Sequence, residues 1–234
     1  MFRMQITLVL ALAALLGGCA KTLQARDVQP SGFLGEYHSL LTKSPEDGAL
    51  KGYRNPTVNW TAYQRILLEP VIVSDGFSST LSVQQRDDLQ RLVDSFYDAL
   101  YLRLSKDYEL VEKPTAGTMR VRVAVAHAEK SWLAPALLSK MSLELQVVNT
   151  LWTFASGKPA FAGEITVEST VHDAQTGELL IAAADRRVGG QNPIDKEVFN
   201  SWGDVKNSLA FWTDLSAYRF CMLRGGTGCV QPKA

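Results

Sequence analysis

The chain has few of the residues on which catalysis, metal binding and membrane spanning usually depend. Its 234 residues include three histidines and three cysteines, and 24 basic residues balance 24 acidic ones. A balanced charge without basic clusters gives no electrostatic footprint for nucleic acid. After the apolar run near the start, no stretch of about 18 apolar residues follows, so the rest of the chain is not expected to span a membrane.

The histidines, His38, His127 and His172, are far apart, and none has a second metal ligand at helical or turn spacing. His127 continues the alternation of Val121 to Val125, which predicts a core or edge position at the end of a strand. No serine lies in a Gly-x-Ser-x-Gly turn, and the only glycine-rich loop lacks a lysine. We therefore expect no metal site, no cofactor and no enzymatic activity.

What the sequence does contain is an N-terminal export signal. Arg3 precedes an apolar run from Ile6 to Leu16, and Gly17, Gly18 and Cys19 follow at once. This order predicts a signal peptide over residues 1–18, cleaved before a cysteine that carries fatty acyl chains such as palmitate. The lipid on Cys19 would then attach the chain to a membrane.

The mature chain is long enough for one domain with a proper core, because 46% of all residues are hydrophobic and 21% are charged. We expect a lipidated tether over residues 19–30, a single α+β domain over residues 31–220 and a C-terminal tail over residues 221–234. Cys221 and Cys229 flank a glycine-rich loop in that tail. In an oxidising compartment they are expected to form a disulfide, with a redox pair as the alternative.

Periodicity predicts a mostly antiparallel sheet, with a long helix after the first strand and a C-terminal helix packed on the sheet. Residues 65–73 form a continuous apolar strand, in which Pro70 requires an edge or a bulge. Ser82 and Gln85 form a capping box for a helix that ends near Lys106. Its apolar stripe consists of Leu89, Leu92, Val93, Phe96, Leu100 and Leu104. The last helix begins between residues 196 and 203 and ends near Phe220.

Residues 164–187 alternate as a β-hairpin whose turn lies at Asp173 to Gly177. Pairing Glu164 with Arg186 would place acid opposite base, and we predict that register. The most plausible polar site in the chain is Asp185 with Arg186 at the end of this hairpin. The competing interpretation is a structural ion pair between Arg186 and Glu164.

At several places the sequence resembles the lipoprotein family of Gram-negative bacteria known as domain of unknown function 3313 (DUF3313). The matching residues cover roughly residues 31 to 215. Besides the signal with Cys19, they are Ser31-Gly32-Phe33-Leu34-Gly35-Glu36-Tyr37, Pro56 to Trp60, Tyr63, Glu69-Pro70-Val71, Asp173, Thr176-Gly177-Glu178, Asp185-Arg186-Arg187 and Trp202-Gly203-Asp204. The resemblance implies an uncharacterised outer-membrane lipoprotein, and it carries no catalytic motif.

Together these features predict an outer-membrane lipoprotein that faces the periplasm and binds or scaffolds a protein or another component of the cell envelope. Ala20 follows Cys19 where many inner-membrane lipoproteins of this kind carry an aspartate, which favours the outer membrane. Two alternatives stay open. One is a subunit of a homo-oligomeric envelope assembly or secretion complex, for which residues 137–154 would supply an amphipathic hairpin. The other is an envelope enzyme whose site forms only in the fold.

Overall fold

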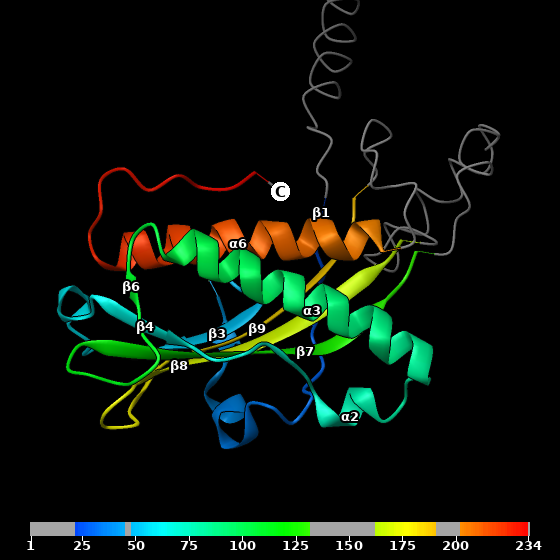
Figure 1. Ribbon diagram of the computed structural model, residues 1–234, viewed down its shortest axis with the longest axis horizontal. Helices are drawn as coiled ribbons and strands as arrows, with labels where there is room; N and C mark the ends of the chain where they lie inside the picture. Colours follow the sequence, from blue (N-terminus) through cyan, green and yellow to red (C-terminus); the bar gives the residue numbers. More distant parts are fainter. Residues whose placement is uncertain (1–21, 45–47, 132–161, 191–201, 234) are drawn as a thin grey trace, which may run out of the picture.

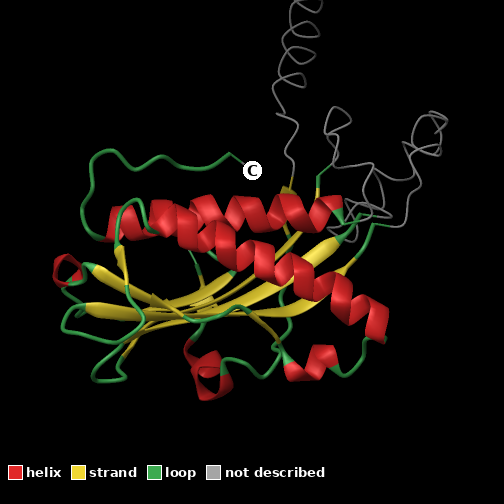
Figure 2. Cartoon of the chain, viewed as in Figure 1, coloured by secondary structure: helices red, strands yellow, loops and turns green. Residues whose placement is uncertain are grey.

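The computed structural model describes residues 22–44, 48–131, 162–190 and 202–233. Over these residues the chain forms a nine-stranded sheet with two long helices on one face (Figure 1, Figure 2). The strands are β1 (Thr22–Gln24), β2 (Thr42–Lys43), β3 (Lys51–Arg54), β4 (Arg65–Leu68), β5 (Ile72–Val73), β6 (Glu109–Leu110), β7 (Thr118–Glu129), β8 (Glu164–Asp173) and β9 (Leu179–Gly189). The helices are α2 (Asp75–Ser78), α3 (Val83–Leu104) and α6 (Gly203–Leu223), and the 3-10 helices are η1 (Gly35–Leu40) and η2 (Trp60–Ala62). This confirms the predicted α+β class.

The sheet is built on the antiparallel strands β7, β8 and β9, in the order β2-β3-β9-β8-β7-β4-β6. The antiparallel strands β1 and β3 pair with successive parts of β9. On the other side β4 and β5 pair with successive parts of β7, and both run parallel to it. A parallel pairing needs a crossover connection, and α3 supplies it across one face of the sheet.

Helix α3 confirms the sequence prediction closely. Ser82 is its N-cap and forms the full capping box with Gln85, and the helix ends at Leu104 rather than near Lys106. The six residues of the predicted stripe are the buried residues of the helix: Leu89, Leu92, Val93, Phe96, Leu100 and Leu104. They pack with α6 and with the sheet in one core, so α3 covers the half of the sheet around β7.

The strand expected at residues 65–73 is interrupted. β4 ends at Leu68, which pairs with Val121, and β5 begins at Ile72, which pairs with Ala124. Three residues around Pro70 therefore lie opposite two residues of β7, which is a bulge of the kind that the proline required. β4 itself is not at the edge, because β6 pairs with its other side.

The register predicted for the hairpin is wrong by two residues. Glu164 pairs with Val188, and Thr166 pairs with Arg186. Near the turn His172 pairs with Leu179 and Val171 with Ile181, so Leu180 is the extra residue of a bulge. A shift of two keeps every side chain on its face, and Arg186 still reaches Glu164 diagonally, with 2.6 Å between Nη2 and Oε2.

The expected tether over residues 19–30 is incorporated into the fold from Thr22 onward. β1 pairs with the end of β9, and the side chains of Ala25 and Val28 are buried. The chain then crosses the sheet face opposite the long helices. There the backbone N–H and the hydroxyl of Ser31 both donate to the fully buried Glu168. We call the face under α3 and α6 the helix face and the opposite one the N-terminal face.

Helix α6 covers β8 and β9 on the helix face. It begins at Gly203 and ends at Leu223, three residues beyond the predicted end. Val205, Leu209 and Trp212 are buried, whereas Trp202 at the N-cap is only partly buried. In the described part of the chain, no helix combines the length and the apolar character that crossing a membrane requires.

Candidate functional site

A cavity of about 110 Å³ lies between α6, α3 and the helix face of the sheet. Its floor contains Ser169 of β8 and Ala183 of β9, which are paired directly across the two strands. Both side chains are small, and both residues stay partly exposed although they point toward the helices. The cavity therefore exists because small residues face a gap that the helices do not fill.

The cavity wall is mainly apolar. Phe96 and Leu100 come from α3, and Trp212 and Phe220 come from α6. Apolar surface in a hollow of this order of size can bind small apolar groups. Polar groups enter the lining at Asp185, Ser216 and Arg219. This combination suits a ligand with an apolar chain and one polar end.

Asp185, one of the two predicted polar-site residues, lies on the helix face at the side of this cavity. Its carboxylate accepts hydrogen bonds from Trp212 Nε1 at 2.7 Å, Gln24 Nε2 at 2.7 Å and the backbone N–H of Leu50 at 3.0 Å. These donors come from α6, β1 and the segment before β3. Asp185 thus ties three separate parts of the chain to β9.

Arg186, the other predicted residue, lies on the N-terminal face because adjacent residues of a strand point to opposite sides. Its guanidinium donates to Glu164 Oε2 at 2.6 Å. The structure therefore separates Asp185 from Arg186 and forms the ion pair that the competing interpretation described.

His172 also lies on the N-terminal face, half-buried beside the ring of Tyr37, at 5.6 Å between ring centroids. Burial lowers the pKa of His172 from its ordinary value of 6.5, and the positive charges of Arg122 and Arg120 lower it further. The lowered pKa favours the neutral form of the imidazole, which packs beside the Tyr37 ring. Its neighbour Asp173 caps the hairpin turn by accepting from the backbone N–H groups of Gln175 and Thr176.

The prediction that His127 continues the apolar side of its strand is wrong. Val125 pairs with Val167 and His127 pairs with Thr166, so Ala126 is the extra residue of a bulge. The bulge turns His127 onto the N-terminal face, where 47% of its side chain is exposed. One ligand atom each of His127, Glu129 and Glu164 lie within 4.8 Å of one another there, a combination that residue spacing did not indicate.

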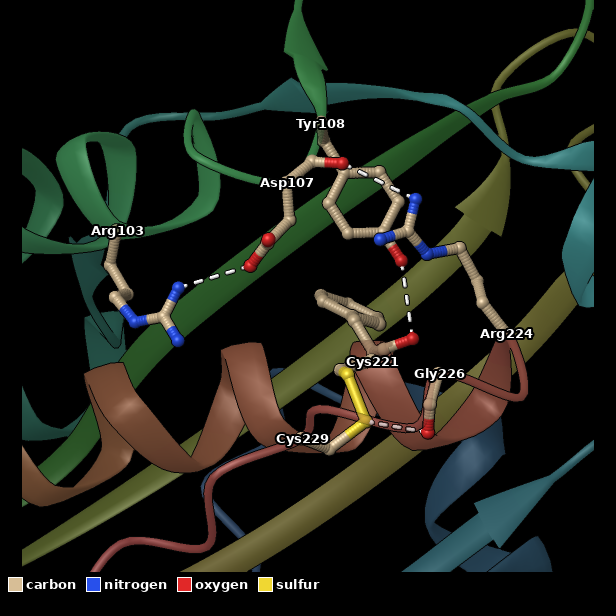
Figure 3. Close-up of a disulfide and its surroundings, with 8 residues drawn as sticks. Arg103, Asp107, Tyr108, Cys221, Arg224, Gly226 and Cys229 are labelled. Atoms are coloured by element: carbon tan, nitrogen blue, oxygen red, sulfur yellow. Dashed lines mark hydrogen bonds and ion pairs between the residues drawn. A yellow bond between two sulfur atoms is a disulfide. The ribbon is translucent and has the colours of Figure 1, made fainter.

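The disulfide between Cys221 and Cys229 is present at the end of α6 (Figure 3). Beside it, the guanidinium of Arg224 stacks on the ring of Tyr108 at 4.1 Å and donates to the carbonyl of Asp107. These contacts fix the start of the tail against the loop that follows α3. Cys19 and the segment 137–154 lie outside the described residues.

Comparison with known proteins identifies one family and a set of solved structures. The family described as "Protein of unknown function (DUF3313)" matches residues 29–216. No curated protein matches the chain. Two similar structures are dodecamers of PelC from Paraburkholderia phytofirmans, one of them a variant with a single substitution. The variant shares 10% and the other structure 9% sequence identity with the chain, each at a TM-score of 0.35, and the alignments cover 75% of this chain and 95% of theirs.

Proposed function

We propose a function from the premise that this chain belongs to the DUF3313 family, as its motifs predicted and as the match over residues 29–216 establishes. The chain acts as a non-enzymatic lipoprotein of the outer membrane, faces the periplasm and binds an acyl chain of an envelope lipid. The observation that supports this binding is the apolar cavity under α6.

The cavity has the chemistry of an acyl-chain site. Phe96, Leu100 and Trp212 offer apolar surface, and burying a methylene group of a ligand there contributes about 0.8 kcal/mol. Arg219 is the cationic residue of the lining on α6, and its charge suits the phosphate end of a lipid.

The expected anchor supports a lipid as the ligand. If the signal is cleaved before Cys19, only Ala20 and Lys21 separate the lipid from β1, which begins at Thr22. Three residue steps reach at most about 11 Å. Thr22 pairs with Gly189, and Ala183 lies six residues along β9, about 20 Å away. An anchor at Cys19 would then hold the cavity within about 30 Å of the membrane surface.

Quenching of Trp212 fluorescence tests this proposal. The full-length protein is placed in vesicles of bromine-labelled phosphatidylethanolamine, and the contribution of Trp212 is taken as the difference from the Trp212→Phe variant. Trp212 is 5% exposed and lines the cavity, so a labelled acyl chain inside the cavity should quench it strongly. We expect quenching in the unmodified protein and its loss in Ala183→Phe, which fills the cavity.

The matched control is Leu102→Phe, which adds bulk to an exposed position of α3 and should leave the quenching unchanged. Ser169→Leu fills the same cavity from β8. It replaces Ala183→Phe in the experiment if Ala183→Phe does not fold. Unquenched Trp212 in the unmodified protein, or equal quenching in the filled variants, would exclude acyl-chain binding here. Particle size in detergent addresses the assembly alternative, since a strictly monomeric particle argues against it.

A further inference from the structure

The cluster of His127, Glu129 and Glu164 is formed by the strand register and one bulge. Glu129 pairs directly with Glu164 across β7 and β8, and His127 is two residues before Glu129 on the same face. The bulge at Ala126 turns His127 and Glu129 onto the N-terminal face. Regular alternation from Val125 would instead point them at the helices. Bulges commonly redirect a side chain at a functional site.

The separation of the ligand atoms matches a shared metal ion. His127 Nε2 and Glu164 Oε1 are 3.5 Å apart, which is longer than a good hydrogen bond. Two ligands at about 2.1 Å from a tetrahedral zinc ion are about 3.4 Å apart. The Glu129 carboxylate lies within the same 4.8 Å group and would move closer to complete the site.

The cluster contains two carboxylates, and Arg186 is paired with one of them, Glu164, at 2.6 Å. Carboxylates on directly opposed residues of a sheet repel each other, and a cation between them turns that repulsion into attraction. Arg186 binds Glu164 through Oε2 and leaves Oε1 directed toward His127. One imidazole nitrogen with two carboxylate oxygens is a donor set for zinc and similar transition metals rather than for calcium or magnesium.

Surrounding groups hold two of these ligands in place. The ring of Phe77 on α2 packs against the imidazole of His127, with 5.1 Å between centroids. Arg186 orients the carboxylate of Glu164, whose side chain is only 7% exposed. Ligands fixed by a surrounding shell lose less freedom when the ion binds. The half-exposed His127 leaves a path from solvent to the cluster.

We propose that His127, Glu129 and Glu164 form a binding site for a divalent transition-metal ion of the zinc class, with a further coordination position open to water or a ligand. The site is on the N-terminal face, opposite the cavity under α6. It is therefore independent of acyl-chain binding, and either proposal can fail without the other.

Calorimetric titration of the chelator-treated, full-length protein with Zn²⁺ alone tests the site. We expect one equivalent to bind, and the affinity to fall at least about tenfold in His127→Ala and in Glu129→Gln. Both positions are partly exposed, so these variants should fold, unlike changes at the buried Glu164. The control His172→Ala removes a histidine of the same face outside the cluster and should bind Zn²⁺ like the unmodified chain.

Two results would overturn the proposal. One is the absence of Zn²⁺ binding at millimolar concentration, and the other is an affinity that His127→Ala leaves unchanged. Ca²⁺ provides a second test, since it should bind much more weakly than Zn²⁺ and should not respond to His127→Ala. Equal affinities for the two ions would contradict the nitrogen-containing ligand set.

Discussion

His172 illustrates how its surroundings change the properties of one residue. The side chain is half-buried on the N-terminal face, beside Tyr37 and near Arg120 and Arg122. Burial and then the two arginines lower its pKa, whereas Glu69 acts in the opposite direction. Since the protonated form is disfavoured only in the folded state, the unfolded chain takes up this proton at higher pH than the folded chain does.

The stability of the protein should therefore decrease as the pH falls below about 6.5, the ordinary histidine value, and through the lower pKa of folded His172. Urea unfolding at several pH values measures this decrease, which should be smaller in His172→Gln because the titrating group is gone. An NMR titration of the ring protons gives the folded pKa directly. A midpoint at or above 6.5 would contradict the lowered value.

At the scale of single elements, α3 depends on local signals that the sequence contains. The Ser82 hydroxyl accepts from the backbone N–H of Gln85, and Gln85 Oε1 accepts from the backbone N–H of Ser82. These bonds satisfy two of the donors that every helix start leaves without a partner inside the helix. The buried stripe then fixes the side of the helix that faces the core.

Replacing Ser82 with alanine should lower the free energy of unfolding by about 1 kcal/mol, because one of these bonds is lost. Chemical denaturation monitored by circular dichroism measures the change. Ser95→Ala is the matched control in the same helix: its hydroxyl bonds only to the carbonyl of Arg91 one turn earlier, so its loss should cost little. Equal losses in both variants would show that the cap does not stabilise α3.

At the scale of the whole molecule, the sheet separates two faces with different chemistry. The helix face holds the main core and the apolar cavity. The N-terminal face holds the segment with Ser31, the buried Glu168 and the cluster around His127. β1 begins at the end of the sheet where Glu164 and Val188 pair, so an anchor at Cys19 would place that end near the membrane.

The anchor itself is testable by Cys19→Ser. Without the cysteine no lipid can be attached, so the exported chain should move from the membrane fraction to the soluble periplasmic fraction. Cell fractionation followed by immunodetection measures the distribution. The control Cys221→Ser removes a cysteine of the tail disulfide and should leave the chain in the membrane fraction. A Cys19→Ser chain that still carries lipid would refute the assignment.

The sequence alone determined those features that depend on local order. The six buried positions of α3, its capping box, the strands of the hairpin and the partnership of Cys221 with Cys229 were all predicted. Each follows from a period, a cap or a short spacing, and neighbouring residues are sufficient to specify these. The effect of Pro70 belongs here too, because a missing N–H group interrupts any strand ladder.

Only the tertiary structure decided the register and the assembly of sites. A shift of two residues in the hairpin preserves the alternation of faces, so the pattern around Glu164 and Arg186 could not reveal it. The alanines around His127 suit either face, so the pattern gave no sign of the bulge. Long-range packing selects among these arrangements. It brought His127 beside Glu129 and Glu164 and sent Asp185 and Arg186 to opposite faces.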